Sequence, residues 1–213
     1  GFLSVLATPV VYHLAPRPKS AYRGGMHPRV KGPTIAPWSR VRTELVAEYR
    51  VFGVERHAIV DGAGQPRMNV NTFRMNDWCN VIAITPEDQL VLVWQYRFGT
   101  GAMSLEVPGG VIDPGETPLE AAVRELREES GYEAASIEPL TSVLPNPAMQ
   151  GNVCHAFVAH GAVPSGAQQF DELEELEVVL VDLADVPALL DEGVIRHALV
   201  VSALETFLRR RRR

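Results

Sequence analysis

Short apolar runs and turn-forming residues alternate along most of the chain from residue 44 onward. β-Branched and aromatic residues concentrate in these runs, and Gly, Pro, Asp and Asn separate them, which is typical of strands. The expected strands lie within 44–60 (interrupted at Gly53), 68–75, 80–85, 89–98, 103–113, 136–144, 151–161 and 178–183. Helices are expected at 118–130, near 186–192 and near 197–209. Strands interleaved with helices predict the α/β class.

The stretch 118–130 carries the clearest helix signals. Thr117 and Glu120 have the Thr-x-x-Glu spacing of a capping box, in which each side chain bonds the backbone N–H of the other residue. Gly131 is suited to end the helix because glycine readily adopts the left-handed conformation found there. Four apolar residues recur at helical spacing and are expected to face the core: Leu119, Ala122, Val123 and Leu126.

Charge is distributed unevenly along the chain. Residues 1–56 carry nine Lys/Arg and three Glu, whereas 57–208 carry six Arg and 23 Asp/Glu, and five arginines form the end at 209–213. Nucleic-acid binding needs Lys and Arg on the contacting surface, so the acidic body is unsuited to it. An acidic body suits a protein that binds metal cations. Six prolines in the first 40 residues favour an extended arm there.

Cysteine usage and hydropathy restrict the class of protein further. Cys79 and Cys154 are the only cysteines and lie far apart in the sequence, which excludes a disulfide-dense scaffold and Cys-rich zinc sites. No apolar run approaches the roughly 20 residues that span a bilayer. We therefore expect a cytoplasmic protein that binds neither membranes nor nucleic acid.

Three glutamates in the predicted helix form a candidate metal site. Glu125, Glu128 and Glu129 stand at i, i+3 and i+4, so their carboxylates gather within one turn. Exposed like charges at this spacing repel by roughly a few tenths of a kcal/mol per pair, and a divalent cation removes that repulsion. Mg²⁺ favours carboxylate and carbonyl oxygens together with substrate phosphates. Taken alone, the cluster also fits a solvated acidic helix face.

The stretch Gly110–Tyr132 contains a family signature. It reads GVIDPGETPLEAAVRELREESGY and resembles the Nudix box, G-x5-E-x7-R-E-U-x-E-E-x-G-U, where U is apolar. The matching fixed residues are Gly110, Glu116, Arg124, Glu125, Glu128, Glu129 and Gly131. Leu126 fills the first apolar slot, and Tyr132 is a mild departure at the last. On this resemblance the chain is identified as a Nudix hydrolase, an enzyme that cleaves a nucleoside diphosphate linked to another group.

The resemblance implies a fold, a cofactor and a metal site. The fold is expected to be a Nudix α/β/α sandwich with a mixed sheet, preceded by a small N-terminal β-region. Mg²⁺, or Mn²⁺ in its place, is expected on the ligands Glu125, Glu128, Glu129 and the main-chain carbonyl of Gly109. Glu128 is also expected to take part in catalysis. Glu116 and Arg124 would form a structural pair that fixes the loop on the helix, and Gly110 and Gly131 are expected to be structural.

The flanking sequence resembles the ADP-ribose pyrophosphatase branch. In WQYRFGTGAMSLEVPGGVIDPGE (94–116), a strand ending in Gln-aromatic-Arg precedes Glu-x-Pro-x-Gly. The resemblance implies that Arg97 contacts the substrate and that Glu106 assists the metal shell. The branch has a catalytic Glu on a loop between two late strands, and FDELEELE matches that loop, with Glu174 first and Glu172 next. Such a carboxylate can orient or deprotonate water; the alternative is a solvated acidic loop.

The N-terminal part resembles a small β-domain that swaps across a dimer in relatives. In PWSRVRTELV, Trp38 matches the aromatic residue that lies over the base. Arg74 is a second candidate, for phosphate or ribose contact, and packing or surface roles are the alternatives for both. We therefore expect a homodimer built from an arm (1–36), a β-region (37–76), a Nudix hydrolase domain (77–208) and an Arg tail (209–213).

The expected reaction is Mg²⁺-dependent hydrolysis of the diphosphate bond of a nucleotide sugar. ADP-ribose is the first choice of substrate and would give AMP and ribose 5-phosphate. Two alternatives stay open. One is a hydrolase of other NDP-sugars such as GDP-mannose, and the other is a non-catalytic Nudix-fold sensor that binds a nucleotide sugar without cleaving it.

Overall fold

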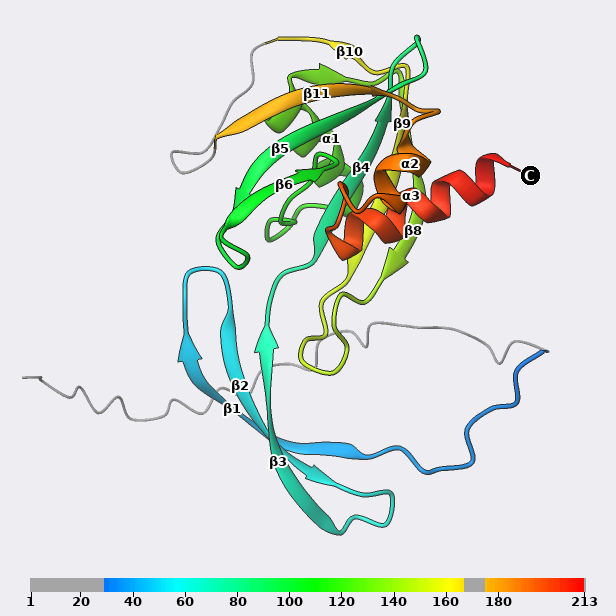
Figure 1. The fold of residues 1–213 in the computed structure, drawn as a ribbon. Coiled ribbons are helices and arrows are strands. Elements are labelled where there is room, and N and C mark those ends of the chain that lie inside the picture. The colour runs from blue at the N-terminus through cyan, green and yellow to red at the C-terminus, as the bar shows by residue number, and fades with distance from the viewer. Residues whose placement is uncertain (1–28, 167–174, 213) are drawn as a thin grey trace, which may run out of the picture. The chain divides into compact units, whose positions relative to one another are not determined.

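The computed structural model describes residues 29–166 and 175–212. These residues form two compact units (Figure 1). The N-terminal unit contains the described residues up to Met75 together with Asn146–Gly151, and the C-terminal unit contains Asn76–Pro145 and the described residues from Asn152 onward. Among the described residues, no helix combines the length and the hydrophobicity needed to cross a membrane.

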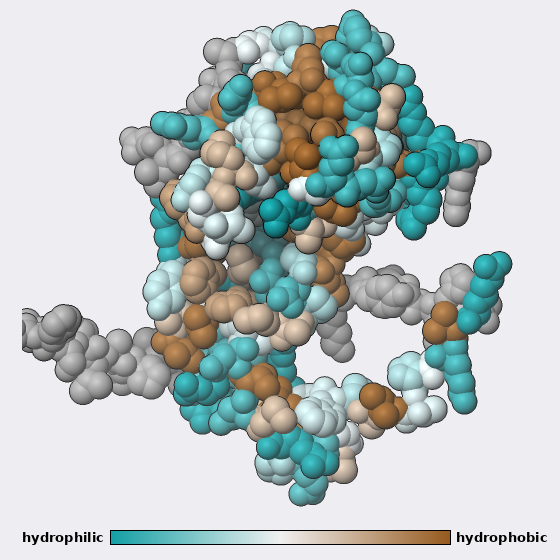
Figure 2. Space-filling view, viewed as in Figure 1, coloured by the Kyte–Doolittle hydropathy of each residue, from teal (hydrophilic) through white to brown (hydrophobic). Residues whose placement is uncertain are grey.

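The N-terminal unit is a three-stranded antiparallel sheet. Its strands follow one another in space as they do in sequence: β1 (Ser39–Glu48), β2 (Gly53–Val60) and β3 (Pro66–Arg74). The turn between β2 and β3 is held by Asp61, whose Oδ1 accepts the backbone N–H of both Ala63 and Gln65 at 2.9 Å. Only Gly53 and His57 are buried among its described residues, and hydrophobic side chains reach the surface over this sheet (Figure 2).

The C-terminal unit is built on a six-stranded mixed sheet. The strands run in the order β11-β5-β4-β9-β8, with β6 paired to β5. Only β4 and β9 are parallel to each other, and the other neighbours are antiparallel. The bounds are β4 Trp78–Ile84, β5 Gln89–Arg97, β6 Ala102–Glu106, β8 Ser136–Val143, β9 Cys154–His160 and β11 Leu176–Asp182. A separate pair joins β7 (Tyr132–Glu133) to β10 (Val163–Pro164).

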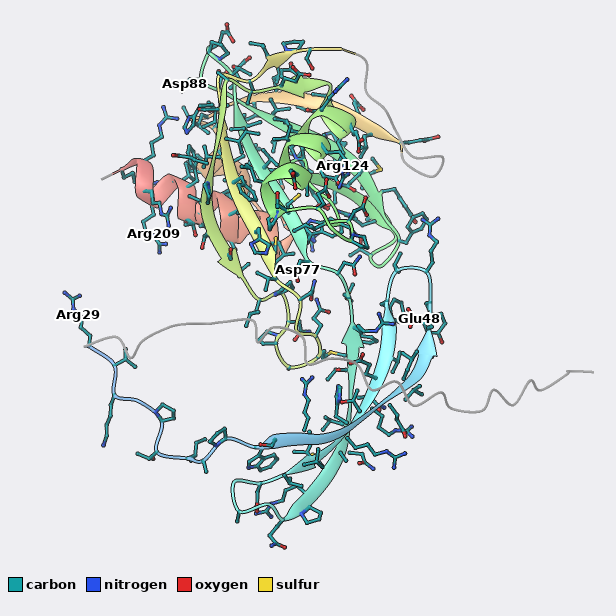
Figure 3. All side chains as sticks on the ribbon, turned by 180° about the vertical axis from the view of Figure 1, so that it is seen from behind. Arg29, Glu48, Asp77, Asp88, Arg124 and Arg209 are labelled. Atoms are coloured by element: carbon teal, nitrogen blue, oxygen red, sulfur yellow. The ribbon has the colours of Figure 1, made fainter. Side chains whose placement is uncertain are left out.

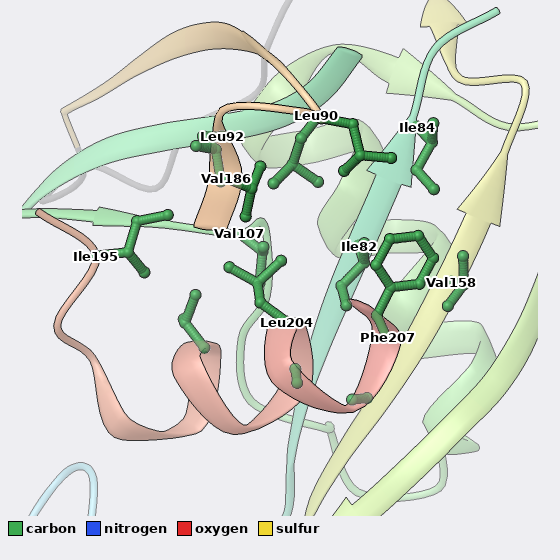
Figure 4. Close-up of a cluster of buried hydrophobic side chains, with 14 of the residues drawn as sticks. Ile82, Ile84, Leu90, Leu92, Val107, Val158, Val186, Ile195, Leu204 and Phe207 are labelled. Atoms are coloured by element: carbon green, nitrogen blue, oxygen red, sulfur yellow. The ribbon is translucent and has the colours of Figure 1, made fainter. Parts of the chain in front are cut away.

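Helices cover both faces of this sheet. Successive residues of β4 alternate between two hydrophobic clusters, because side chains of a strand point to opposite faces. One cluster contains α3 (Ala198–Arg211) and the start of α2 (Val186–Asp191), and Leu204 and Phe207 of α3 lie against Ile82 and Val158 (Figure 4). The other cluster contains α1 (Pro118–Ser130). This is the α/β class with a mixed sheet expected from the sequence.

Both ends of α1 are formed as expected. The Thr117 side chain accepts the backbone N–H of Glu120 at 3.3 Å, and Glu120 Oε2 accepts that of Thr117 at 2.7 Å. Gly131 ends the helix at φ 71°, a conformation that favours glycine over residues with a side chain. The capping box therefore fixes where the helix begins.

The orientation of α1 corrects one expectation. Leu119 and Val123 were expected in the core, but they are 43% and 49% exposed. Ala122 and Leu126 are buried as expected, and Ala121, which was not expected there, is buried with them. At 3.6 residues per turn, residues 121, 125 and 129 form one row, and 119, 123 and 127 form another. The two small alanines let the helix approach the sheet closely, so the row that carries Glu125 and Glu129 turns inward.

Candidate active site

The three motif glutamates of α1 differ in how deeply they are buried. Glu125 and Glu129 are buried, whereas the side chain of Glu128 is 39% exposed. Glu129 Oε2 accepts the backbone N–H of Gly109 at 2.8 Å, which ties the helix to the loop that precedes the motif. Buried carboxylates without such partners are costly. Glu125 and Glu129 therefore lie on the side of α1 that faces this loop, and Glu128 is the most accessible of the three to solvent.

Arg124, which lies on α1 (labelled in Figure 3), connects the motif loop to these glutamates. Its Nε and Nη2 donate to the two oxygens of Glu116 at 2.9 Å each, so the expected ion pair is present. Its Nη1 also donates to Glu125 at 2.8 Å and to Glu128 at 3.1 Å. The hydrogen bond that Arg124 donates to Glu116 is the main cause that raises the pKa of Arg124, and the same contact lowers the pKa of Glu116. One guanidinium thus bonds three carboxylates, and its single positive charge balances only part of their negative charge.

Two glycines allow the motif loop to lie close to its neighbours. A Cβ on Gly110 would lie 2.3 Å from Glu125 Oε1, and a Cβ on Gly109 would lie 2.2 Å from the main-chain oxygen of Cys79. The second clash involves backbone, so a side chain at 109 would force the loop away from β4. The close approach explains the glycine at the first motif position, Gly110, for which a structural role was expected, and the glycine directly before the motif, Gly109.

The residues present fit a divalent metal by the chemistry of their donors. Glu125 and Glu128 both lie within hydrogen-bonding distance of one cationic nitrogen of Arg124, which shows that this spot suits positive charge. Carboxylate oxygens are the ligands that Mg²⁺ prefers. In the described part of the chain, however, no three His, Cys, Asp or Glu side chains are arranged to hold a metal ion. The expected ligands are neighbours, but Arg124 and the Gly109 amide bind their oxygens.

Arg97 and Glu106 form a partly buried ion pair with each other. Arg97 Nε and Nη2 donate to the two carboxylate oxygens of Glu106 at 2.9 and 2.8 Å, a bidentate arrangement between β5 and β6. Glu106 is 1% exposed. Burial alone raises the pKa of Glu106, but the hydrogen bonds and charge of Arg97, with smaller contributions from His197 and Ser104, hold it below its usual range. The carboxylate is therefore ionised at neutral pH.

A short polar chain extends from this pair towards the motif loop. The Arg97 Cζ lies 5.7 Å from the centroid of the Trp78 ring, within the range of a cation–π contact. Trp78 Nε1 donates to Asn80 Oδ1 at 3.1 Å. A Cβ on Gly109 would lie 2.9 Å from the same Asn80 oxygen, so Asn80 packs directly against the loop that holds Glu129. These contacts join the two groups of predicted site residues within the C-terminal unit.

Sequence reasoning missed His197, which also faces Glu106. Its Nδ1 lies 3.6 Å from Glu106 Oε2, although the two residues are far apart in sequence. Burial is the main cause that lowers the pKa of His197; Glu106 opposes the shift and Arg97 adds to it. His197 stands immediately before α3 in a segment without a recognisable motif, so no signal in the sequence distinguished it from the other histidines.

The remaining predicted site residues lie elsewhere. Trp38 belongs to the N-terminal unit, is 55% exposed and has the Arg67 guanidinium carbon 6.0 Å from its ring centroid. Arg74 of the same unit forms ion pairs with Glu48 and Glu55. Glu172 and Glu174 lie outside the described residues.

Comparison with known proteins identifies the family. Residues 79–204, which include the motif and most of the C-terminal unit, match the NUDIX domain. The chain therefore belongs to the Nudix hydrolase family, enzymes that act on phosphorus-containing anhydrides. The family, the enzyme class and the fold class predicted from the motif are confirmed.

Individual relatives are similar over different lengths of the chain. It is 32% identical to the ADP compounds hydrolase NudE of Escherichia coli over 179 residues, 84% of this chain and 93% of that protein. It is 31% identical to the ADP-ribose pyrophosphatase of Bacillus subtilis over 126 residues, 59% of this chain and 68% of that protein. A crystal structure of an ADP compounds hydrolase superposes with a TM-score of 0.72 at 29% identity, covering 85% of this chain and 97% of that one.

Proposed function

We propose that this enzyme hydrolyses the diphosphate bond of a nucleoside diphosphate sugar, with ADP-ribose as the preferred substrate and AMP and ribose 5-phosphate as products. The observation that carries the proposal is the complete carboxylate set on α1, joined through Asn80 and Trp78 to the Arg97–Glu106 pair. The names of two relatives, ADP-ribose pyrophosphatase and ADP compounds hydrolase, support the choice of an ADP-linked substrate.

Glu125, Glu128 and Glu129 are the proposed metal ligands, together with the carbonyl of Gly109. Mg²⁺ on these ligands, or Mn²⁺ in its place, supplies charge neutralisation of the diphosphate and polarisation of the phosphorus under attack. Glu128 is the carboxylate best exposed to accept a proton from water. Glu174 and Glu172 are proposed as further catalytic carboxylates. Arg124 keeps the glutamates close together, since its Nη1 bonds two of them.

Arg97 is the proposed contact to the substrate's phosphates. The Arg97 side chain is 30% exposed and its guanidinium is bonded to Glu106, so its position is defined while part of the side chain faces solvent. A planar guanidinium suits bidentate contact with phosphate oxygens. Glu106, in addition to its proposed part in the metal shell, fixes that orientation.

A homodimer in the cytoplasm completes the proposal. The N-terminal unit exposes several large apolar side chains, including Val41, Tyr49 and Met68, which a second copy could cover. Trp38 is the proposed stacking residue for the base, and Arg74 is proposed to contact phosphate or ribose. The two cysteines are free and buried, which suits a reducing compartment.

A panel of nucleotide sugars tests the function. Purified protein is incubated with Mg²⁺ and either ADP-ribose, ADP-glucose or GDP-mannose, and release of AMP or GMP is followed. We expect AMP from ADP-ribose at the highest kcat/KM, and loss of activity with EDTA that added Mg²⁺ restores. Preference for GDP-mannose would identify a different NDP-sugar hydrolase. Tight binding of one compound without turnover of any would identify a sensor.

A further inference from the structure

Glu106 has two basic neighbours, of which only one is hydrogen-bonded to it. Arg97 uses two donors on this carboxylate, at 2.9 and 2.8 Å. The ring of His197 approaches the same Oε2 from the start of α3, with its Nδ1 at 3.6 Å. That Nδ1 is buried and has no hydrogen-bond partner among the described residues. An unpaired buried polar atom beside a buried carboxylate is uncommon, because each such atom loses its water without replacement.

The proposed function creates a conflict at Arg97. The donors that a phosphate would bind are the ones that Glu106 accepts in this structure. When those donors turn to a substrate, Glu106 loses both hydrogen bonds of Arg97 while it stays buried at 1% exposure, and among the described side chains only Ser104 is left bonded to it. A second donor within reach of Oε2 would offset that loss.

We propose that His197 is this second donor: a positioning residue whose neutral imidazole donates from Nδ1–H to Glu106 when Arg97 engages the diphosphate of the substrate. The inference rests on the proposed function, because it concerns a contact made by the same site. A small rotation of the ring suffices to convert the 3.6 Å approach into a hydrogen bond. Glu106 then stays ionised and in place in both states, and Arg97 is free to move between them.

The surroundings favour a neutral ring with its hydrogen on Nδ1. Burial lowers the pKa of His197, with Arg97 adding to this and Glu106 opposing it. A neutral imidazole carries one N–H, and the nitrogen next to a carboxylate is the one that gains from carrying it. Ser104, the other side chain that bonds Glu106, contributes a hydroxyl and is already engaged.

Steady-state kinetics with ADP-ribose and Mg²⁺ test the role. His197→Leu removes the donor, and His197→Asn restores one near the position of Nδ1. We expect His197→Leu to raise KM roughly ten- to a hundredfold with a smaller change in kcat. The loss of one hydrogen bond to a charged group weakens binding by about this factor. His197→Asn should recover most of the loss. His160→Leu is the matched control, because His160 faces Glu138 at 3.5 Å on an exposed strand end.

A double-mutant cycle with Glu106→Gln shows whether His197 acts through Glu106. Once the charge at 106 is gone, His197→Leu should have little further effect on KM. Equal effects of His197→Leu in both backgrounds, or a KM within twofold of wild type with Glu106 present, would overturn the proposal. Melting temperatures of all variants separate this outcome from simple unfolding.

Ring ¹⁵N NMR of the unliganded protein distinguishes failure of this inference from failure of the proposed function. We expect the Nδ1–H tautomer at His197, and a stronger hydrogen bond at that nitrogen when inorganic pyrophosphate is added as a probe for Arg97. The Nε2–H tautomer would overturn the role of His197 whatever the substrate. If the tautomer is as expected but no nucleotide sugar is hydrolysed, the proposed function fails while the His197–Glu106 contact stands.

Discussion

The two units of the molecule differ in how many side chains they bury. The C-terminal unit packs hydrophobic side chains on both faces of its sheet, and even its charged residues Glu106, Glu125 and Glu129 are buried with partners. The N-terminal unit buries only Gly53 and His57 among its described residues. Judged by its described residues, a three-stranded sheet that buries so little has little to offset the entropy of ordering its chain. Its stability must therefore come from surfaces beyond the sheet itself.

Ion pairs add little to the stability of the N-terminal unit. In the N-terminal unit Glu44 pairs with Arg42 and Arg56 at 3.2 and 3.0 Å, and these arginines are largely exposed. Exposed pairs of this kind contribute about 0–1 kcal/mol each. The Arg124 network of the C-terminal unit is different, because one guanidinium joins three carboxylates of which two are mostly buried. The charged residues around Arg124 therefore hold the site of the C-terminal unit together, whereas the ion pairs of Glu44 lie at the surface of the N-terminal unit.

The largest expected effect concerns chemistry in the C-terminal unit. Glu128→Gln should lower kcat for ADP-ribose roughly a thousandfold, because a lost metal ligand removes several kcal/mol of transition-state stabilisation. Stability should change little, since the side chain is 39% exposed. Glu133→Gln makes the same change of charge at an exposed position just beyond α1 and serves as the control. Activity within tenfold of wild type would remove Glu128 from the proposed site.

The contrast in packing predicts unequal costs of truncation. Leu204→Ala, at a fully buried position of α3, should lower the free energy of unfolding by about 2–5 kcal/mol. Val41→Ala, at an exposed position of β1, should cost the monomer less than about 0.5 kcal/mol. Urea denaturation measures both. In the proposed homodimer, Val41→Ala should instead weaken association, which ultracentrifugation detects; equal costs in monomer unfolding would contradict the contrast.

His57 should make the stability of the N-terminal unit depend on pH. Its ring bonds Thr43 and Thr72 at 2.8 and 2.7 Å, and burial, helped by Arg40 and opposed by Glu55, lowers its pKa. The unfolded chain therefore binds the proton more readily than the folded one. Stability contributed by the neutral ring is present above about pH 6.5 and falls as the pH drops below it, by at most about 1.4 kcal/mol per pH unit.

The measurement for His57 is urea denaturation at pH 7.5 and 5.5, monitored by the fluorescence of Trp38 in a protein whose other two tryptophans are replaced by Phe. His57→Gln lacks the titrating ring and should lose less stability across this range than the protein with His57. An equal loss in both proteins would show that the pH dependence comes from other groups.

The smallest expected effect is local to the start of α1. Thr117→Ala removes the acceptor for the Glu120 N–H and should lower the free energy of unfolding by about 1 kcal/mol. Thr117→Ser keeps the hydroxyl and should be close to wild type. Because the helix is also held by the Arg124 network and by its buried face, kcat should be unchanged, as steady-state assays of both variants will show. A large fall in kcat would mean that the cap itself positions the glutamates.

Sequence patterns predicted the C-terminal unit well because its signals are local. The capping box, the strand runs and the Nudix spacing each depend on residues close together in the chain, and each is found in the structure. The predicted orientation of α1 was wrong in part, because Leu119 and Val123 are as hydrophobic as core residues but are exposed. Only the close packing of Ala121 and Ala122 against the sheet decides which row turns inward.

Contacts between distant segments could not be predicted. The bond of Glu129 to Gly109 and the approach of His197 to Glu106 join residues whose spacing follows no local period. The Arg97–Glu106 pair was visible only as two separate expectations, one for substrate and one for metal. In the structure Arg97 donates both of these hydrogen bonds to Glu106, because the antiparallel pairing of β5 and β6 brings the two residues together. The two separate expectations did not suggest this contact.

The parallel pairing of β4 with β9 has a consequence for synthesis on the ribosome. β4 emerges early, but its neighbour β9 follows only after the hairpin partners, α1 and β8 have been made. The pairing of β4 with β9 therefore cannot form until most of the chain has left the exit tunnel, and non-local pairing of this kind is slow. β4 and the hydrophobic segments next to it stay open to other chains during that delay. Translation rate and chaperone supply are accordingly expected to influence the yield of folded enzyme.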